Sequence, residues 1–169
     1  GSYLPERVIS NREAGAALKI DPDTITRLTG IEERRWADPA QASSDLAVEA
    51  ARAALNAAGL EPTAMEAILV STTSPDMAFP STACHVQRKL TCGSVPAFDV
   101  AASCSGFLYG LSMADAMIRS GQIKTCLVAS AEVKSRTLDP HDLDTAVLFG
   151  DGAGAVIVQG EQEDGQPGR

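Results

Sequence analysis

The sequence predicts an α/β protein with a mixed, mostly parallel sheet that carries helices on its faces. Short apolar runs that suit buried strands alternate along the chain with longer amphipathic segments that suit helices. This alternation of strand and helix is typical of a parallel sheet covered by helices. The strand segments are also apolar along their whole length, as expected for strands that are buried on both faces.

Two helices are expected ahead of the first buried strand. An Asp-Pro pair starting at Asp21 begins the first helix, because Asp suits the N-cap and Pro suits the first turn, and Gly30 ends it. The second helix begins at Ser43 or Ser44, either of which can cap it. Its apolar residues recur at helical spacing as far as Gly59, which ends it.

The rest of the chain is predicted to continue the alternation and to close with a hairpin. Strands are expected where short apolar, β-branched runs occur, and helices where apolar residues recur at helical spacing. In order, the segments are a strand at 67–73, a helix at 80–90, a strand at 95–101, a helix at 104–121, a strand at 125–132 and two strands within 145–158.

The glycine-rich stretch GDGAGAVIV, residues 150–158, has some likeness to a nucleotide-binding loop. Such a loop needs its glycines to close a strand and open a helix, whose N-terminus then holds the phosphate. The β-branched residues at 156–158 favour a strand instead. Because Asp151-Gly152 is a hairpin-turn signal, we interpret the stretch as the turn of the terminal hairpin and not as a nucleotide site.

Charge and composition exclude several classes of partner. The net charge of −8 argues against sequence-independent binding to nucleic acid or to an anionic membrane, both of which need basic surface. No apolar stretch approaches the roughly 20 residues that a membrane-spanning helix needs. We therefore expect no nucleic-acid partner and no membrane association.

The cysteine and histidine pattern predicts neither a metal site nor a disulfide framework. The four cysteines form no C-x-x-C pair, and the two histidines, His85 and His141, are not clustered. We expect no metal and a cytoplasmic protein with reduced thiols. Cys84 and His85 are not expected to act as a catalytic pair, because adjacent positions of a helix do not face each other.

Cys104 has a setting that differs from that of the other cysteines. The segment FDVAAS runs into it as a strand, and SGFLYGL leaves it as a helix. Small neighbours give a substrate carbonyl access to the sulfur, and a helix N-terminus stabilises a thiolate. Cys84, Cys92 and Cys126 are expected to be buried structural cysteines, and on the residues alone that alternative stays open for Cys104.

Several motifs occur together in a characteristic order. They are GSYLPE, TGIEERRW, STTSPDMAFPSTACHVQ, PAFDVAASCSGF and GDGAGAVIV. With them the chain closely resembles the β-ketoacyl-acyl-carrier-protein (ACP) synthase III family, condensing enzymes of fatty acid and polyketide synthesis. The resemblance implies a thiolase-like layered fold, with residues 1–160 as its N-terminal half-domain. It also implies a first strand ahead of Gly1, and residues 161–169 are expected to be a polar tail or a severed linker.

The resemblance also implies an activity. In the family, the cysteine of the AASCSGF motif takes an acyl group from a thioester, a malonyl thioester loses CO₂, and the resulting carbanion attacks the acyl-enzyme. Cys104 matches that catalytic nucleophile. The implied partners are an acyl thioester (acyl-CoA or acyl-ACP), malonyl-ACP and the acyl carrier protein, with no cofactor, and the intact protein is expected to be a homodimer.

Two aromatic residues match family positions at the substrate site. Phe79 matches the aromatic that reaches across a homodimer into the partner's acyl pocket, and Phe149 matches a position that lines the pocket. The family's remaining catalytic residues, a His and an Asn, belong to a second half of the fold beyond residue 169. This chain alone is therefore expected not to catalyse condensation.

The sequence departs from the family where bacterial fatty-acid members hold the adenine of coenzyme A. Thr24, Leu143 and Leu28 stand where those members have a Trp, an Arg and a second Arg. None of the three can reproduce the stacking or the phosphate pairing, so a different acyl donor, such as one carried on a protein, is expected. Arg34 and Arg35 are local candidates for docking an acidic carrier.

Three interpretations of function follow. The first is a condensing acyltransferase of the 3-oxoacyl-ACP synthase III type. The second is a starter-unit acyltransferase of specialised metabolism, which the loss of the adenine contacts favours. The third is a non-catalytic dimerisation partner of the same fold, against which the intact motif around Cys104 argues.

Overall fold

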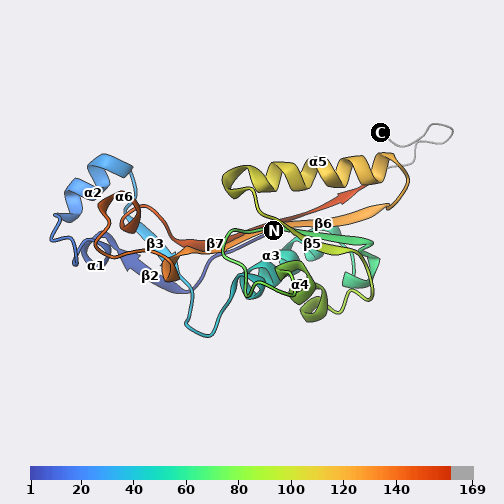
Figure 1. Ribbon diagram of the computed structural model, residues 1–169, viewed down its shortest axis with the longest axis horizontal. Coiled ribbons are helices and arrows are strands. Elements are labelled where there is room, and N and C mark those ends of the chain that lie inside the picture. Colours follow the sequence, from blue (N-terminus) through green and yellow to red (C-terminus); the bar gives the residue numbers. More distant parts are fainter. Residues whose placement is uncertain (161–169) are drawn as a thin grey trace.

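A five-stranded sheet with helices on both faces forms the body of the computed structural model, which describes residues 1–160 (Figure 1). In spatial order the strands are β1 (Ser2–Tyr3), β7 (Asp151–Gln159), β6 (Thr125–Val133), β4 (Ala67–Ser71) and β5 (Ala97–Val100). β6, β4 and β5 pair in parallel, whereas β7 pairs antiparallel with both β6 and β1. Within this sheet β7 thus runs against the other strands, and the predicted mixed, mostly parallel α/β fold is confirmed.

Helices pack on the two faces of the sheet and create two apolar cores. α3 (Ser43–Ala58) and α4 (Thr82–Leu90) cover one face, and α5 (Gly106–Arg119) covers the other (Figure 1). β4 lies between β6 and β5, and its side chains are buried along the whole strand. Because side chains alternate between the faces of a strand, Ile68 and Val70 join the core under α3 and α4, while Leu69 joins the core under α5.

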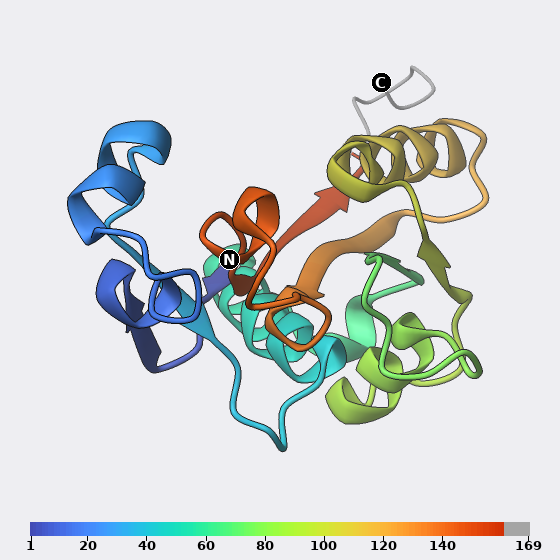
Figure 2. The same cartoon turned by 60° about the vertical axis from the view of Figure 1, so that its left-hand side comes forward.

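A small lobe lies beyond one end of this layered body (Figure 2). Its elements are β2 (Arg7–Ser10), α1 (Asn11–Ala14), α2 (Pro22–Thr29) and β3 (Glu33–Trp36), with β2 and β3 paired antiparallel. α2 begins after Asp21 and ends at Gly30, as predicted. The two strands and α1 were not predicted, because these short segments carry charged residues and lack the apolar pattern of the central strands.

Arg34 of β3 ties the lobe to the segment that leads into β7. Its side chain is buried, and its Nη2 donates to Asn11 Oδ1 at 2.8 Å and to the main-chain oxygen of Val147 at 2.7 Å. Val147 directly follows α6 (Leu143–Ala146). Burial lowers the pKa of Arg34. The prediction that Arg34 docks an acidic carrier is therefore wrong, because its guanidinium is enclosed and bonded within the chain.

The predicted terminal hairpin is also wrong. Residues 143–146 form α6, and β7 runs as one strand from Asp151 to Gln159, paired antiparallel with β6 along its length. The Asp-Gly turn signal is overridden because the buried carboxylate of Asp151 binds other segments. It accepts hydrogen bonds from the main-chain N–H of Ala37 at 2.7 Å and of Ser135 at 2.8 Å, and from Ser135 Oγ at 2.6 Å.

The predicted cap of α3 is wrong because both serine hydroxyls are used in tertiary contacts. Ala42 is the N-cap, and the Asp45 carboxylate accepts a hydrogen bond from its main-chain N–H at 2.8 Å. Ser43 Oγ donates to the main-chain oxygen of Ser74 at 2.5 Å, and Ser44 Oγ donates to Asp76 at 2.5 Å. These contacts fasten the start of α3 to the loop after β4.

The predicted domain boundaries concern the two ends of the chain. β1 lies at the edge of the sheet, and the strand expected ahead of Gly1 stays a prediction. The predicted polar tail or severed linker at 161–169 lies outside the described residues. Within residues 1–160, no helix is long and apolar enough to cross a membrane.

Candidate active site

Cys104 lies on a turn between a strand and a helix, as the sequence predicts. β5 ends at Val100, a single 3₁₀ turn (η2) covers Ser103–Ser105, and α5 begins at Gly106. Ser103 has a φ of +48°, in the left-handed region that residues other than glycine rarely adopt. A sharp turn of this kind lifts a side chain out of the surrounding structure. Cys104 is accordingly exposed.

Gly106 explains part of the small-residue pattern around Cys104. A Cβ at Gly106 would lie 2.1 Å from Ser71 Oγ and 3.3 Å from the main-chain oxygen of Val100. α5 therefore begins in direct contact with the carboxyl end of β4. The small residues around Cys104 were expected to give a substrate access to the sulfur, whereas at Gly106 the structure requires a small residue for packing.

Cys104 lines a cavity of about 510 Å³ where the parallel strands end. Residues of its wall come from the loop after β4, from η2, from the carboxyl end of β6 and from the segment before β7. They include Thr73, Cys104, Glu132, Lys134, Thr145 and Phe149. In open α/β sheets, ligands bind at the carboxyl ends of the strands, and the volume lies in the range of small-molecule sites, about 300–1,000 Å³.

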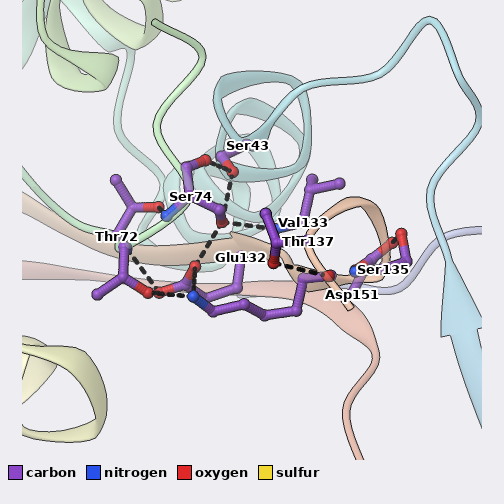
Figure 3. Close-up of polar contacts among 10 residues, drawn as sticks. Ser43, Thr72, Ser74, Glu132, Val133, Ser135, Thr137 and Asp151 are labelled. Carbon is purple, nitrogen blue, oxygen red and sulfur yellow. Dashed lines mark hydrogen bonds and ion pairs between the residues drawn. The ribbon is translucent and has the colours of Figure 1, made fainter. Parts of the chain in front are cut away.

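A polar network, drawn in Figure 3, contributes Thr73, Glu132 and Lys134 to the lining of this cavity. Glu132 Oε1 accepts hydrogen bonds from the main-chain N–H of Thr73 at 2.8 Å and from Thr73 Oγ1 at 2.9 Å, and Oε2 accepts one from Ser74 Oγ. Ser74 Oγ in turn accepts a hydrogen bond from the main-chain N–H of Val133 at 2.9 Å. The network joins the loop after β4 to the end of β6 and fixes the Glu132 carboxylate.

Lys134 follows β6 and extends the network into the cavity wall. Its Nζ donates to Thr73 Oγ1 at 2.5 Å and lies 3.8 Å from Glu132 Oε2. The neighbouring Ser135 is held by the buried carboxylate of Asp151 (Figure 3). The backbone beside Lys134 is thus anchored through β7.

The two aromatic residues matched to the family lie in different places. Phe149 lines the same cavity as Cys104. Phe79 lies in the loop before α4 with 86% of its surface exposed, and it is not among the residues that line the cavity. The structure therefore brings Phe149, but not Phe79, to the Cys104 site of the same chain.

The three residues matched by resemblance to the adenine contacts do not line the cavity. Thr24 and Leu28 are on α2, and Leu143 begins α6. Leu28 and Leu143 are exposed, and Thr24 is half-buried. Arg35, the second docking candidate, is half-buried; its Nη1 donates to the main-chain oxygen of Pro5 at 3.2 Å, and Nη2 lies 3.7 Å from Glu33.

Thr73, Glu132 and Lys134 line the cavity but were not predicted from the sequence. An available signal was the change from apolar to polar residues where two buried strands end, since Thr73 follows β4 and Glu132 lies near the end of β6. Neither His85 nor His141 lines the cavity. In the described part of the chain, no group of three or more His, Cys, Asp or Glu residues is placed to hold a metal ion.

Cys104 should react before the other three cysteines when iodoacetamide is limiting at pH 8. Cys104 is exposed, Cys84 is half-buried, and Cys92 and Cys126 are buried. Burial also raises the pKa of Cys92, and it raises that of Cys126 to about 12, so few of these thiols are thiolates at pH 8. Peptide mapping by mass spectrometry measures the order, and earlier labelling of Cys84 would contradict the assignment.

Comparison with known proteins places this architecture in a family. The family model for 3-oxoacyl-[acyl-carrier-protein] synthase III matches residues 98–167. A β-ketoacyl-[acyl-carrier-protein] synthase III of Laribacter hongkongensis is 50% identical over 165 residues, which cover 98% of this chain and 52% of that protein. This chain belongs to the β-ketoacyl-ACP synthase III family. A second member, from Ehrlichia canis, is 47% identical over 97% of this chain and 51% of its own length.

Solved structures of the family share the fold. The 3-oxoacyl-[acyl-carrier-protein] synthase III of Aquifex aeolicus matches with a TM-score of 0.92 and 44% identity, over 96% of this chain and 53% of that one. A priming β-ketosynthase of a polyketide biosynthetic pathway matches with a TM-score of 0.89 and 33% identity, over 95% of this chain and 49% of that one. The chain spans about half the length of the relatives it matches.

Proposed function

We propose that this chain is the acyl-accepting half of a condensing enzyme of the 3-oxoacyl-ACP synthase III type. The observation that carries the proposal is the exposed thiol of Cys104, on a strand-to-helix turn inside a ligand-sized cavity, in a chain of that family. The whole protein would take an acyl group from a thioester onto Cys104 and then condense it with a malonyl thioester.

Acyl transfer needs little beyond the geometry around Cys104. Its sulfur attacks the thioester carbonyl, the carrier thiolate leaves and takes up the proton, and a Cys104 thioester remains. The first N–H groups of a helix have no partner within the helix, so those near the start of α5 can stabilise the negative carbonyl oxygen. Phe149 offers the acyl chain an apolar contact in the cavity.

The second step would use groups outside the described residues. Loss of CO₂ from the malonyl thioester leaves a carbanion, which attacks the Cys104 thioester and releases the thiol. The family resemblance assigns a His and an Asn of the other half to this step. Malonyl-ACP would be the second substrate and the acyl carrier protein a partner, and the exposure of Phe79 is compatible with a role across a homodimer.

A starter-unit acyltransferase of specialised metabolism is the second candidate. The observation that favours it is the absence of aromatic and cationic side chains at Thr24, Leu28 and Leu143, where the resemblance expects adenine contacts. The similarity to a priming β-ketosynthase is compatible with this assignment. The two candidates share the chemistry at Cys104 and differ in the acyl donor and in the pathway.

Labelled acyl-CoA and acyl-ACP, offered separately to the chain, test the proposal. We expect label on Cys104 in the wild-type chain, no label above background in Cys104→Ala, and unchanged labelling in the matched Cys84→Ala variant. Mass spectrometry of the peptides gives the site. Equal labelling of Cys104→Ala would overturn the assignment, and labelling from acyl-ACP but not from acyl-CoA would support a donor carried on a protein.

A further inference from the structure

We infer that Lys134 forms an oxygen-binding subsite in the Cys104 cavity, which selects acyl groups bearing a hydroxyl or keto oxygen. As a statement about substrate, the inference rests on the proposed function. As a statement about the cavity, it rests on the contacts of Lys134, Glu132 and Thr73. All three residues line the cavity that contains the Cys104 thiol.

The carboxylate of Glu132 is already satisfied by the protein. It accepts two hydrogen bonds from Thr73 and one from Ser74. About three-quarters of its side chain is buried, since 26% is exposed. Glu132 therefore acts as a fixed counter-charge that holds Thr73 in place, and its oxygens have little remaining capacity for a ligand.

Lys134 has hydrogen-bonding capacity that its described contacts do not use. An ammonium group has three N–H donors, and Lys134 Nζ spends one on Thr73 Oγ1 at 2.5 Å. Its distance of 3.8 Å to Glu132 Oε2 allows an ion pair but is too long for a hydrogen bond. With 29% of the side chain exposed, the remaining donors can reach a molecule in the cavity.

The charge balance indicates which kind of oxygen fits. Lys134 and Glu132 neutralise each other, so the wall presents directed N–H donors without a net positive charge. A substrate carboxylate would be repelled by the negative charge of Glu132. A hydroxyl or keto oxygen could accept a hydrogen bond from Lys134 without this repulsion. A purely alkyl chain would displace water from these donors and leave them unpaired, and this is how a polar site rejects an analogue that lacks the oxygen.

Disulfide exchange at Cys104 tests the subsite without any enzymatic step. The thiolate of Cys104 displaces one half of a symmetric disulfide RSSR, forms Cys104–S–S–R, and releases RS⁻, which takes up a proton. Probes are used in pairs that differ only in an end group, an ω-hydroxyalkyl disulfide and the alkyl disulfide with methyl in place of hydroxyl, at three chain lengths. Each reaction contains the disulfide RSSR together with its matching thiol RSH as a redox buffer. Mass spectrometry of peptides gives the fraction of modified Cys104.

In the folded wild-type chain, we expect at least one hydroxyl probe to be favoured over its alkyl partner by about tenfold, as a hydrogen bond to a charged group allows. This preference should disappear in Lys134→Met, which keeps the aliphatic stem, and in the wild-type chain unfolded in urea. It should persist in Lys124→Met, a matched control with an exposed lysine just before the opposite end of β6.

Equal modification by the two members of every pair in the folded wild-type chain would overturn the inference. So would a preference that survives in Lys134→Met. In either case Lys134 serves only to bind Thr73 and to pair with Glu132. If Lys134→Met fails to fold, equal modification of the folded wild-type chain by both members of every pair still overturns the inference. Because the readout needs only the thiol, failure of thioester labelling would overturn the proposed function and leave this result standing.

Discussion

Replacing Asp151 by alanine should lower the free energy of unfolding by about 4 kcal/mol, because three donors would lose a buried charged acceptor. Asp151 is 5% exposed. Its carboxylate binds the main-chain N–H of Ala37 and both the N–H and the hydroxyl of Ser135. Without it, the end of β3, the segment after Lys134 and the start of β7 lose the hydrogen bonds that this carboxylate forms between them.

Two further variants separate this explanation from a general effect of lost charge. Asp151→Asn keeps one acceptor oxygen but turns an NH₂ group toward the donors. Its free energy of unfolding should therefore lie between those of the wild type and of Asp151→Ala. Asp144→Ala removes an exposed carboxylate on α6 and should change stability by less than about 0.5 kcal/mol. Urea unfolding at pH 7 measures all three, and an Asp151→Ala variant as stable as Asp144→Ala would contradict the role given to Asp151.

The elements that the sequence predicts well are those set by local pattern. α3 and α5 show apolar residues at helical spacing, and Gly59 lies in the left-handed conformation that ends α3. β4 and β6 are apolar because both of their faces are covered, so each reads as a strand without knowledge of its neighbours. For these elements, local preference and tertiary packing agree.

The errors in the fold arise where a distant residue decides the local structure. Asp151-Gly152 has the composition of a turn, but its backbone is extended because Asp151 binds Ala37, far away in the chain. β2 and β3 have no apolar alternation, and the buried Arg34 that joins them to Val147 looks like a surface residue in the sequence. No window of sequence contains both partners of these contacts.

The candidate site likewise has a part that local sequence predicts and a part that depends on distant residues. The turn at Cys104 can be predicted because its small residues are neighbours in sequence, and Phe149 could be placed beside it by family resemblance. Thr73 and Lys134 are separated by many residues and meet only because β4 and β6 are adjacent and parallel. The polar wall of the cavity therefore depends on the order of the strands in the sheet, which could not be predicted from the sequence.

The chain of 169 residues should accept an acyl group on Cys104 and yet form no detectable β-ketoacyl product. Carbon–carbon bond formation needs donors for the oxyanion of the malonyl thioester, and the family resemblance assigns these to a His and an Asn beyond residue 169. Of the described residues, neither His85 nor His141 lines the Cys104 cavity. Loss of one such donor typically costs about 10²–10³ in rate, and here both would be missing.

Incubation of the chain with a labelled acyl thioester and a malonyl thioester separates the two steps. We expect protein-bound label that depends on Cys104, with product below the detection limit at every malonyl concentration. Cys104→Ala supplies the background for both measurements, because it removes the acyl acceptor while α5 keeps Gly106 against Ser71. Sustained formation of β-ketoacyl product by the purified chain would show that the described half contains the whole condensing machinery, and the division of labour between two halves would then have to be abandoned.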